Sequence, residues 1–271
     1  MFPILLHLGR LSLPTYGFLA AAGLLAGLSV SARNARRLGL DPEQTWNLGI
    51  FAILGGIVGA KLLLMVSDWR FYKAYPREVF TLTTLQAGGV WSGGLAAALL
   101  LSWWYIRRNQ LPVLKTCDVF APGIALGHAI GRLGCFAAGC CWGKPTTLPW
   151  GVTFTNPFAV IAGVPLGVAL HPTQLYEMIL ELANFFLLSW LLARRRFDGQ
   201  VIGAYMFVYG FFRYFLEYLR DDPGRGSVLQ GFMSGTQLLA IGLVIAGGLL
   251  WMRRGSQPEA TSASQAAGKS S

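Results

Sequence analysis

Apolar residues dominate seven stretches of the chain, and short polar or charged segments separate each stretch from the next. About 20 apolar residues are enough to cross the hydrocarbon core of a bilayer as a helix. Because backbone polar groups cannot face lipid unpaired, each stretch is predicted to be helical. The fold class that follows is an all-α polytopic membrane protein with about seven transmembrane helices. The predicted spans are residues 14–32, 46–66, 89–106, 117–138, 173–193, 201–219 and 235–252.

The amino-acid composition agrees with a chain that faces lipid over much of its surface. Of 271 residues, 54% are hydrophobic and 13% are charged, whereas a soluble domain carries about 25% charged residues. This excludes an ordinary soluble enzyme, a disordered protein and a coiled coil. The net charge of +10 comes from basic residues that cluster between the apolar stretches. Nucleic-acid binders carry basic residues along one face, so we expect no nucleic-acid partner.

The distribution of basic residues predicts the orientation of the spans. If the N-terminus lies outside, twelve Lys and Arg residues fall on the cytoplasmic side and seven on the outer side. Basic residues concentrate in cytoplasmic loops, so we expect an N-out/C-in topology. Residues 1–254 are predicted to form a single transmembrane domain. The Ser- and Ala-rich residues 255–271 are predicted to be a disordered cytoplasmic tail.

The connection between the fourth and fifth spans, residues 139–172, is longer than a simple turn and lies on the outer side in this topology. Within it, residues 150–170 alternate weakly between apolar and polar positions, which indicates a short strand pair or a lid. We therefore expect a small extracytoplasmic loop region.

Ionisable residues inside the predicted spans mark a candidate site, because a charge at the centre of a bilayer costs about 2.5–3.5 kcal/mol. Arg213 and Glu217 are four residues apart and are expected to pair. Arg132 has no acidic residue within a helical turn and lies among glycines. A guanidinium in that setting suits a fixed anion such as phosphate. The other charges share helix faces: His128 with Arg132, Glu177 with Glu181, and Arg220 with Arg213 and Glu217.

Four segments, in order along the chain, resemble those of a known family. The run Gly127 to Gly143 (GHAIGRLGCFAAGCCWG) resembles the signature of the prolipoprotein diacylglyceryl transferases. Residues 171–177 (HPTQLYE) are similar to the family's HPSQLYE, and residues 209–223 (YGFFRYFLEYLRDDP) to its YGxFRxxxExxRxPD. Residues 15–17 (TYG) are similar to its early WYG. The resemblance covers about residues 14–252.

The resemblance implies an enzyme of the bacterial cytoplasmic (inner) membrane, with seven spans and an active site toward the outer leaflet. Family members transfer the diacylglyceryl group of phosphatidylglycerol to the lipobox cysteine thiol of prolipoprotein signal peptides and release glycerol 1-phosphate. The implied partners are therefore phosphatidylglycerol and prolipoproteins. No cofactor and no metal ion are expected, and we expect a monomer.

The resemblance also implies site residues, position by position. Arg132 matches the signature arginine that holds the phospholipid headgroup, and Arg220 matches a second essential arginine. Tyr16 matches the early tyrosine and Gly143 the glycine that closes the signature. Cations suit a leaving phosphate, which agrees with these roles. The expected substrate-binding residues further include Cys135, Cys140, Glu177 and Arg213.

The chain departs from the family pattern at functional positions. Cys135 and Cys140 stand where the signature has an asparagine and a glutamate, and residues 90–94 (VWSGG) lack the histidine of the family's SFHGG. That histidine is the favoured thiol-activating base. His128 and His171 are the remaining candidates, because imidazole suits proton transfer at neutral pH.

Three of the four cysteines, Cys135, Cys140 and Cys141, lie within seven positions of one another. No second cysteine or histidine pair follows at the spacing of a structural zinc site, so we expect none. Three interpretations stay open: small thiols that pack, a thiolate at Cys140 or Cys141 beside Arg132, or an outer thiol pair that is oxidised or binds metal.

Other functions stay open at this point. A divergent paralogue would use a phospholipid donor with another acceptor, and a chain without a thiol-activating base would bind lipid without chemistry. If the chain were a transporter, we would expect inverted repeats. The sequence shows no internal repeat of 20–50 residues, which weighs against transport.

Overall fold

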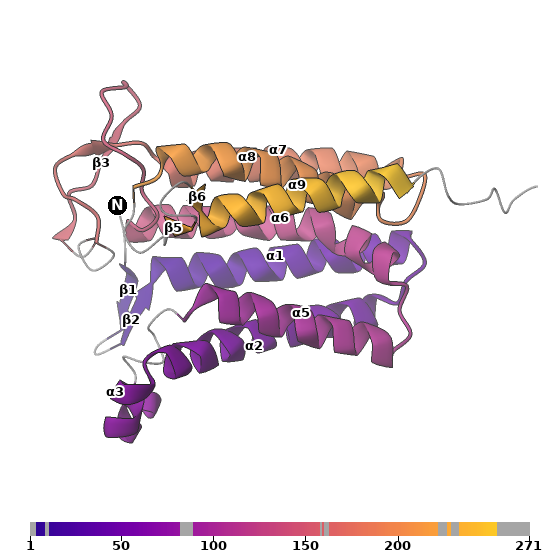
Figure 1. Ribbon diagram of the computed structural model, residues 1–271, viewed down its shortest axis with the longest axis horizontal. Helices are drawn as coiled ribbons and strands as arrows, with labels where there is room; N and C mark the ends of the chain where they lie inside the picture. The colour runs from indigo at the N-terminus through magenta and orange to yellow at the C-terminus, as the bar shows by residue number, and fades with distance from the viewer. Residues whose placement is uncertain are drawn as a thin grey trace, which may run out of the picture. The chain divides into compact units, whose positions relative to one another are not determined.

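The computed structural model describes residues 4–8, 11–81, 89–157, 159, 163–221, 227–228 and 233–253. Seven helices of 17–26 residues account for most of this part of the chain (Figure 1). They are α1 Thr15–Arg37, α2 Pro42–Ser67, α5 Trp91–Arg108, α6 Val113–Ala138, α7 Thr173–Ala193, α8 Gln200–Leu216 and α9 Gly235–Met252. Shorter elements are α3 Trp69–Ala74 and the 3-10 helices η1 Pro76–Phe80 and η3 Glu217–Leu219. The predicted tail, residues 255–271, lies outside the described residues.

Each predicted span overlaps one of the seven long helices. Five of these, α1, α2, α6, α7 and α9, are long and apolar enough to cross a membrane. Their apolar side chains are widely exposed: on α2, Leu54, Ile57 and Val58 are each more than half exposed, at 56%, 55% and 55%. Lipid is the partner that such a surface requires. The chain therefore has the architecture of a polytopic membrane protein, while seven spans and their orientation stay predictions.

The chain divides into two compact units. One of them, Leu28–Phe120, holds the second half of α1, all of α2 and α5, and the start of α6. Its helices α2 and α5 cross closely at two glycines. A Cβ atom added to Gly59 would lie 2.6 Å from the carbonyl oxygen of Gly93, and the reverse distance is also 2.6 Å. Small residues thus let two backbones approach, as in many membrane helix pairs.

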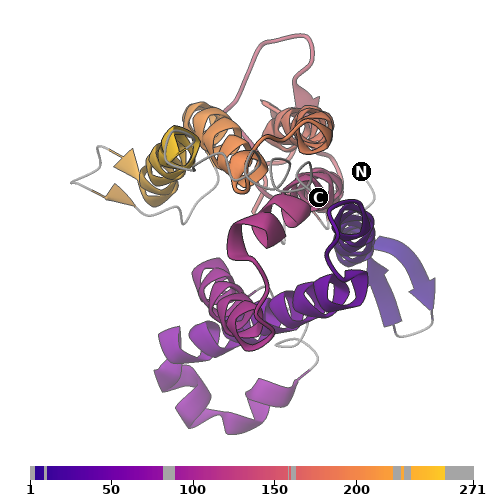
Figure 2. The same cartoon turned by 90° about the vertical axis from the view of Figure 1, so that its right-hand side faces the viewer.

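The other unit comprises Met1–Gly27 and Ala121–Ser271, and it contains every residue of the candidate site. Its helix α8 (orange in Figure 2) packs against both α7 (salmon) and α9 (yellow). The same close approach through glycine recurs here. A Cβ added to Gly23 of α1 would lie 2.7 Å from the carbonyl oxygen of Gly127 in α6, and one added to Gly247 of α9 would lie 2.5 Å from that of Gly203 in α8.

The described residues also form three two-stranded antiparallel sheets, one before α1 and two between helices. They are β1 Ile4–Leu8 with β2 Leu11–Pro14, β3 Val152–Thr153 with β4 Ala169–Leu170, and β5 Ser227–Val228 with β6 Met233–Ser234. The β3–β4 pair confirms the strand pair predicted within residues 150–170. A small apolar core forms around it from Trp142, Phe154, Ala159, Val164 and Leu170. This core packs together described residues of the connection between α6 and α7 at the edge of the candidate site.

Candidate active site

A buried glutamate on α7 is surrounded by three arginines. Glu177 is 2% exposed. Its carboxylate lies 2.8 Å from Nη2 of Arg132, 3.9 Å from Nε of Arg213 and 3.8 Å from Nη1 of Arg220. The arginines come from α6, α8 and the residue that follows η3. A shared carboxylate offsets part of the cost of holding several guanidiniums among apolar helices.

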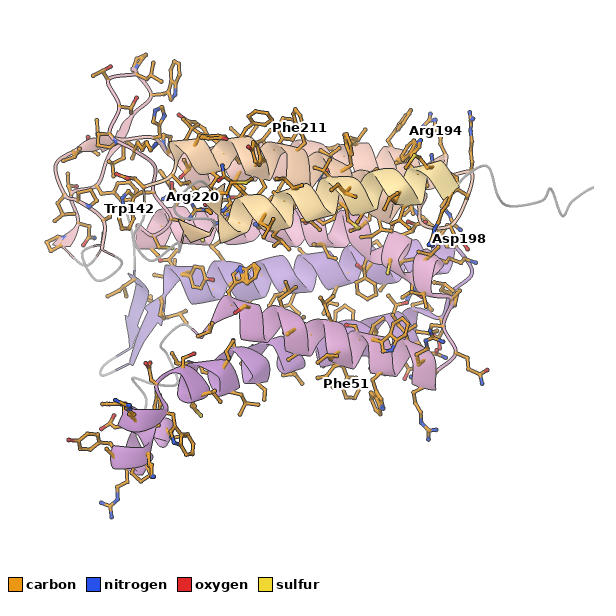
Figure 3. The ribbon with its side chains drawn as sticks, in the orientation of Figure 1. Phe51, Trp142, Arg194, Asp198, Phe211 and Arg220 are labelled. Atoms are coloured by element: carbon orange, nitrogen blue, oxygen red, sulfur yellow. The ribbon has the colours of Figure 1, made fainter. Side chains whose placement is uncertain are left out.

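Local chain geometry brings Arg220 to this cluster. Helix α8 tightens into η3 at Glu217, and Arg220 then adopts an extended backbone, with φ −90° and ψ 148°. In this conformation it forms an isolated antiparallel bridge with Gly143. Figure 3 shows Arg220 and Trp142 at the same end of this unit. The predicted pair of Arg213 and Glu217 is confirmed, with 2.9 Å between Nη1 and Oε2.

Arg132 has no acidic residue within a helical turn, but another helix supplies one. Its partner Glu177 is 45 residues away in sequence, whereas helical spacing reports neighbours on the same helix only. Arg132 also donates from Nε to Nε2 of His128 at 3.2 Å. Its Nη1 faces the sulfur of Cys135 at 3.9 Å. Because sulfur is a weak acceptor, this edge of the guanidinium keeps donor capacity for an anion.

The two candidate bases lie in different surroundings. His128 belongs to the cluster: its Nδ1 is 3.2 Å from Oε1 of Glu181, and its Nε2 accepts from Arg132. His171 lies just before α7, with Nδ1 3.2 Å from the hydroxyl of Tyr176. That hydroxyl also accepts from Nε1 of Trp150 at 2.8 Å. The ring of His171 also packs edge-to-face against that of Tyr176, with the ring centroids 6.1 Å apart.

Tyr16 and Gly143 each lie against a neighbouring segment of this unit. Tyr16, in the first turn of α1, lies against Gly134 of α6, where an added Cβ would be 3.2 Å from Cδ2 of the tyrosine. A Cβ added to Gly143 would lie 2.6 Å from the carbonyl oxygen of Leu219 and 2.7 Å from Cβ of His171. Glycine is therefore required at residue 143 for the bridge to Arg220.

Gly143→Ala is expected to lower the stability of the folded protein by about 1–3 kcal/mol, the usual cost of overpacking. The new methyl group meets backbone on one side, and backbone does not move aside easily. Thermal unfolding of the detergent-purified protein measures the effect. Gly242→Ala is the matched control, because an added Cβ there meets nothing within 4 Å. Equal unfolding temperatures for the two variants would contradict the close approach at Gly143.

Three thiols converge at the end of α6. The Sγ atoms of Cys135, Cys140 and Cys141 lie within 4.8 Å of one another, and all three thiols are free. Hydrogen bonds from Cys135 and Cys140, followed by the charges of Arg220 and Arg132, lower the pKa of the Cys141 thiol, although burial opposes the shift. The thiols therefore form part of the same electrostatic environment as the arginine cluster.

The sequence interpretation did not single out Tyr209, although it opens the segment YGFFR. Its ring centroid lies 5.5 Å from that of His128 and 5.7 Å from that of Tyr205, on which it stacks. With Glu177 and Arg213 it lines a small cavity between α7 and α8. The available signal is its position four residues before Arg213, on the same face of the helix.

The family of the chain is shown by its relatives. The family model "Prolipoprotein diacylglyceryl transferase" matches residues 3–253. A phosphatidylglycerol–prolipoprotein diacylglyceryl transferase of Clostridium tetani is 36% identical over 248 residues, covering 91% of this chain and 95% of the relative. Proteins with the same name from Finegoldia magna and Vibrio cholerae are each 32% identical; they cover 88% and 92% of this chain and 90% and 89% of their own lengths. The chain therefore belongs to the prolipoprotein diacylglyceryl transferase family.

Proposed function

We propose that this chain transfers the diacylglyceryl group of phosphatidylglycerol to the lipobox cysteine thiol of prolipoproteins and releases glycerol 1-phosphate, a step of lipoprotein maturation. The arrangement of three arginines around Glu177 carries the proposal. The reaction expels a phosphate, which needs positive charge beside it. The names of relatives at 32–36% identity support the same reaction.

The reaction is a displacement at carbon. The acceptor thiol loses its proton, and its sulfur attacks the carbon that joins the diacylglyceryl group to the phosphate. A carbon–sulfur bond forms and the carbon–oxygen bond breaks. The electron pair of the broken bond goes to the phosphate oxygen of glycerol 1-phosphate. Donors and charges fixed beside that oxygen lower the barrier, because they stabilise the charge as it develops.

We assign contact with the phosphate to Arg132. Its side chain is 14% exposed, and its Nη1 edge faces the weak acceptor Cys135. A phosphate oxygen can therefore bind at this edge of the guanidinium without breaking the hydrogen bond to Glu177 at 2.8 Å. Arg213 and Arg220 complete the positive field around that carboxylate. The half-exposed Tyr16 and the buried Gly143 shape the substrate-binding region, and Cys135 and Cys140 line it.

The contacts of the two histidines suggest different roles. The lone pair of His128 Nε2 is occupied by the N–H of Arg132 Nε. We therefore assign His128 the role of positioning Arg132. His171 bonds Tyr176 through Nδ1, and its backbone pairs with Gly143 and Lys144. It stays the candidate for receiving a proton, because its Nδ1 contacts a hydroxyl, whereas Nε2 of His128 accepts from a guanidinium.

We further propose a monomer in the bacterial cytoplasmic membrane, with seven spans, the N-terminus outside and the arginine cluster toward the outer leaflet. The uneven distribution of Lys and Arg supports this orientation. The cluster forms where α6 ends and α7 begins, so in this orientation it lies at the outer level. A lipid headgroup also lies at that level.

Expression of this chain in a bacterial strain depleted of its own transferase tests the function. We expect growth to be restored and a reporter prolipoprotein to gain the mass of one diacylglyceryl group on its lipobox cysteine. A reporter with serine in place of that cysteine is the matched control and should stay unmodified. If the chain accumulates in the membrane while the cysteine reporter stays unmodified, the proposed function is wrong.

A further inference from the structure

The three converging thiols form a side-chain cluster that the displacement described above does not use. We infer that Cys135, Cys140 and Cys141 bind one thiophilic divalent cation, with Zn²⁺ as the representative ion, and that its fourth coordination position takes the acceptor thiol. The inference rests on the proposed transfer reaction and names the group that activates its nucleophile.

The distances between the sulfurs fit such a site. Zinc bound to thiolates has Zn–S bonds of about 2.3 Å, so sulfurs at tetrahedral angles are about 3.8 Å apart. The three Sγ atoms already lie within 4.8 Å of one another. Small side-chain rotations are therefore enough to bring them onto one ion. Three protein ligands with one open position are the arrangement of a catalytic zinc site, whereas a structural site is closed by four.

The backbone that carries two of the thiols is fixed in place. The carbonyl oxygen of Cys140 accepts from Nε2 of Gln174 at 2.7 Å, and that of Cys141 accepts from Oγ1 of Thr173 at 2.8 Å. Both donors lie at the start of α7 and are 1% exposed. Cys141 has a φ of +65°, a left-handed conformation that costs a residue with a side chain about 1 kcal/mol or more. The chain thus keeps a strained backbone at the residue that completes the thiol cluster.

The neighbouring charges suit a metal–thiolate complex. Three thiolates and one divalent cation carry a net charge of −1, and a fourth thiolate makes the net charge −2. Nη1 of Arg132 lies 3.9 Å from Sγ of Cys135, and Arg220 and Arg132 both interact electrostatically with Cys141. Fixed cations beside an anionic complex stabilise it, the more so where water is partly excluded.

A bound cation would perform the step for which His128 is poorly placed. The Nε2 of His128 accepts from Arg132, so it is not free to take the proton of the acceptor. When the acceptor thiol binds the cation as fourth ligand, its S–H bond breaks, its proton passes through water to the candidate base His171, and its sulfur stays as a bound thiolate. That sulfur then attacks the diacylglyceryl carbon, and its bond to the metal breaks as the carbon–sulfur bond forms. The phosphate leaves with the electron pair of the carbon–oxygen bond, and no oxidant or reductant is required.

Metal binding by the full-length protein, purified without chelators into lipid nanodiscs, tests the site independently of activity. We expect one zinc ion per chain. After zinc is removed, Co²⁺ should give the thiolate-to-cobalt charge-transfer absorption of a sulfur-rich site. Cys140→Ser and Cys141→Ser should each weaken Zn²⁺ binding by about 100-fold or more. Cys117→Ser is the matched control, because residue 117 lies about 27 Å from Cys135 along α6 at about 1.5 Å per residue; it should bind zinc as the wild type does.

The acceptor provides the second readout. A lipobox peptide should change the charge-transfer absorption of the cobalt-loaded protein, and the same peptide with serine in place of cysteine should leave it unchanged. Removal of the metal should lower peptide lipidation by about 100-fold, and added Zn²⁺ should restore it. Serine variants that elute as folded protein but bind zinc normally would overturn the inference.

Two further outcomes separate this inference from the function on which it rests. If the metal-free wild type lipidates the peptide at full rate, the metal site is wrong and the transfer function stands. If the zinc-loaded wild type binds the peptide thiol to its metal but never lipidates it, the transfer function fails and the metal site stands. A disulfide among the three cysteines of the freshly purified protein would also overturn the inference, because the thiols would not be available to a metal.

Discussion

Replacing Arg132 with alanine is expected to lower the rate of diacylglyceryl transfer by about 100- to 1,000-fold, the usual effect of removing one preorganised donor from a developing anion. The substitution removes the guanidinium whose Nη2 binds Glu177 at 2.8 Å and whose Nη1 faces the thiols. The leaving phosphate then has no cation at this position. The rate is measured as the gain of one diacylglyceryl mass by a lipobox peptide at saturating phosphatidylglycerol.

Arg194→Ala is the matched control for this substitution. Arg194 is an exposed cation at the C-terminal end of α7, stacked over the ring of Trp190 at 4.8 Å. Figure 3 shows Arg194 and Arg220 at opposite ends of the unit that contains the candidate site. Its removal should leave transfer close to the wild-type rate. The transfer rate of Arg132→Lys should lie between the rates of Arg132→Ala and Arg194→Ala, because an ammonium keeps the charge but lacks the planar fork of a guanidinium. Equal rates for the two alanine variants would contradict the role assigned to Arg132.

Glu177→Ala is expected to lower the stability of the protein by about 3–5 kcal/mol, as expected when one partner of a buried ion pair is removed. Arg132, Arg213 and Arg220 would then face one another without the carboxylate that they share. We expect a marked fall in the temperature at which the purified protein unfolds, together with a low yield. Glu177→Gln keeps the shape and one acceptor oxygen, so its effect should be smaller.

Glu43→Ala removes a carboxylate from an exposed position in the first turn of α2, and it is the control for a lost negative charge. Its unfolding temperature should stay near that of the wild type, since exposed charges contribute little to stability. If Glu177→Ala and Glu43→Ala unfold at the same temperature, Glu177 does not hold the arginines together in the way that the distances indicate.

The positions of the helices could be predicted from the sequence because lipid imposes a simple rule, a helix for every long apolar stretch. The rule is less reliable at helix ends. The sixth span was predicted to continue to residue 219, but α8 ends at Leu216 and the chain tightens into η3. This end sets the position of Arg220, which leaves η3 with an extended backbone and bridges Gly143. Apolar length carries no information about such a turn.

The residue types of the site could be predicted, and so could a partner on the same helix, but a partner on another helix could not. The pairing of Arg213 with Glu217 follows from helical spacing and is confirmed. The partner of Arg132 lies on another helix, 45 residues away, and nothing in the spacing of a single helix reports it. The thiols show the same limit. Spacing along the sequence indicated no structural zinc site and left the arrangement of the thiols open, whereas the turn at Gly139, with φ +78°, brings three sulfurs within 4.8 Å of one another.

A single reaction in which both products are quantified tests whether the protein performs diacylglyceryl transfer. The purified protein would be incubated with phosphatidylglycerol labelled in its diacylglyceryl group and with a synthetic lipobox peptide, alongside Arg132→Ala. We predict that the wild type forms lipidated peptide and glycerol 1-phosphate in equal molar amounts, and that the variant loses both. If the folded wild type binds the lipid but forms neither product, or releases glycerol 1-phosphate without modifying the peptide, the protein does not perform this transfer.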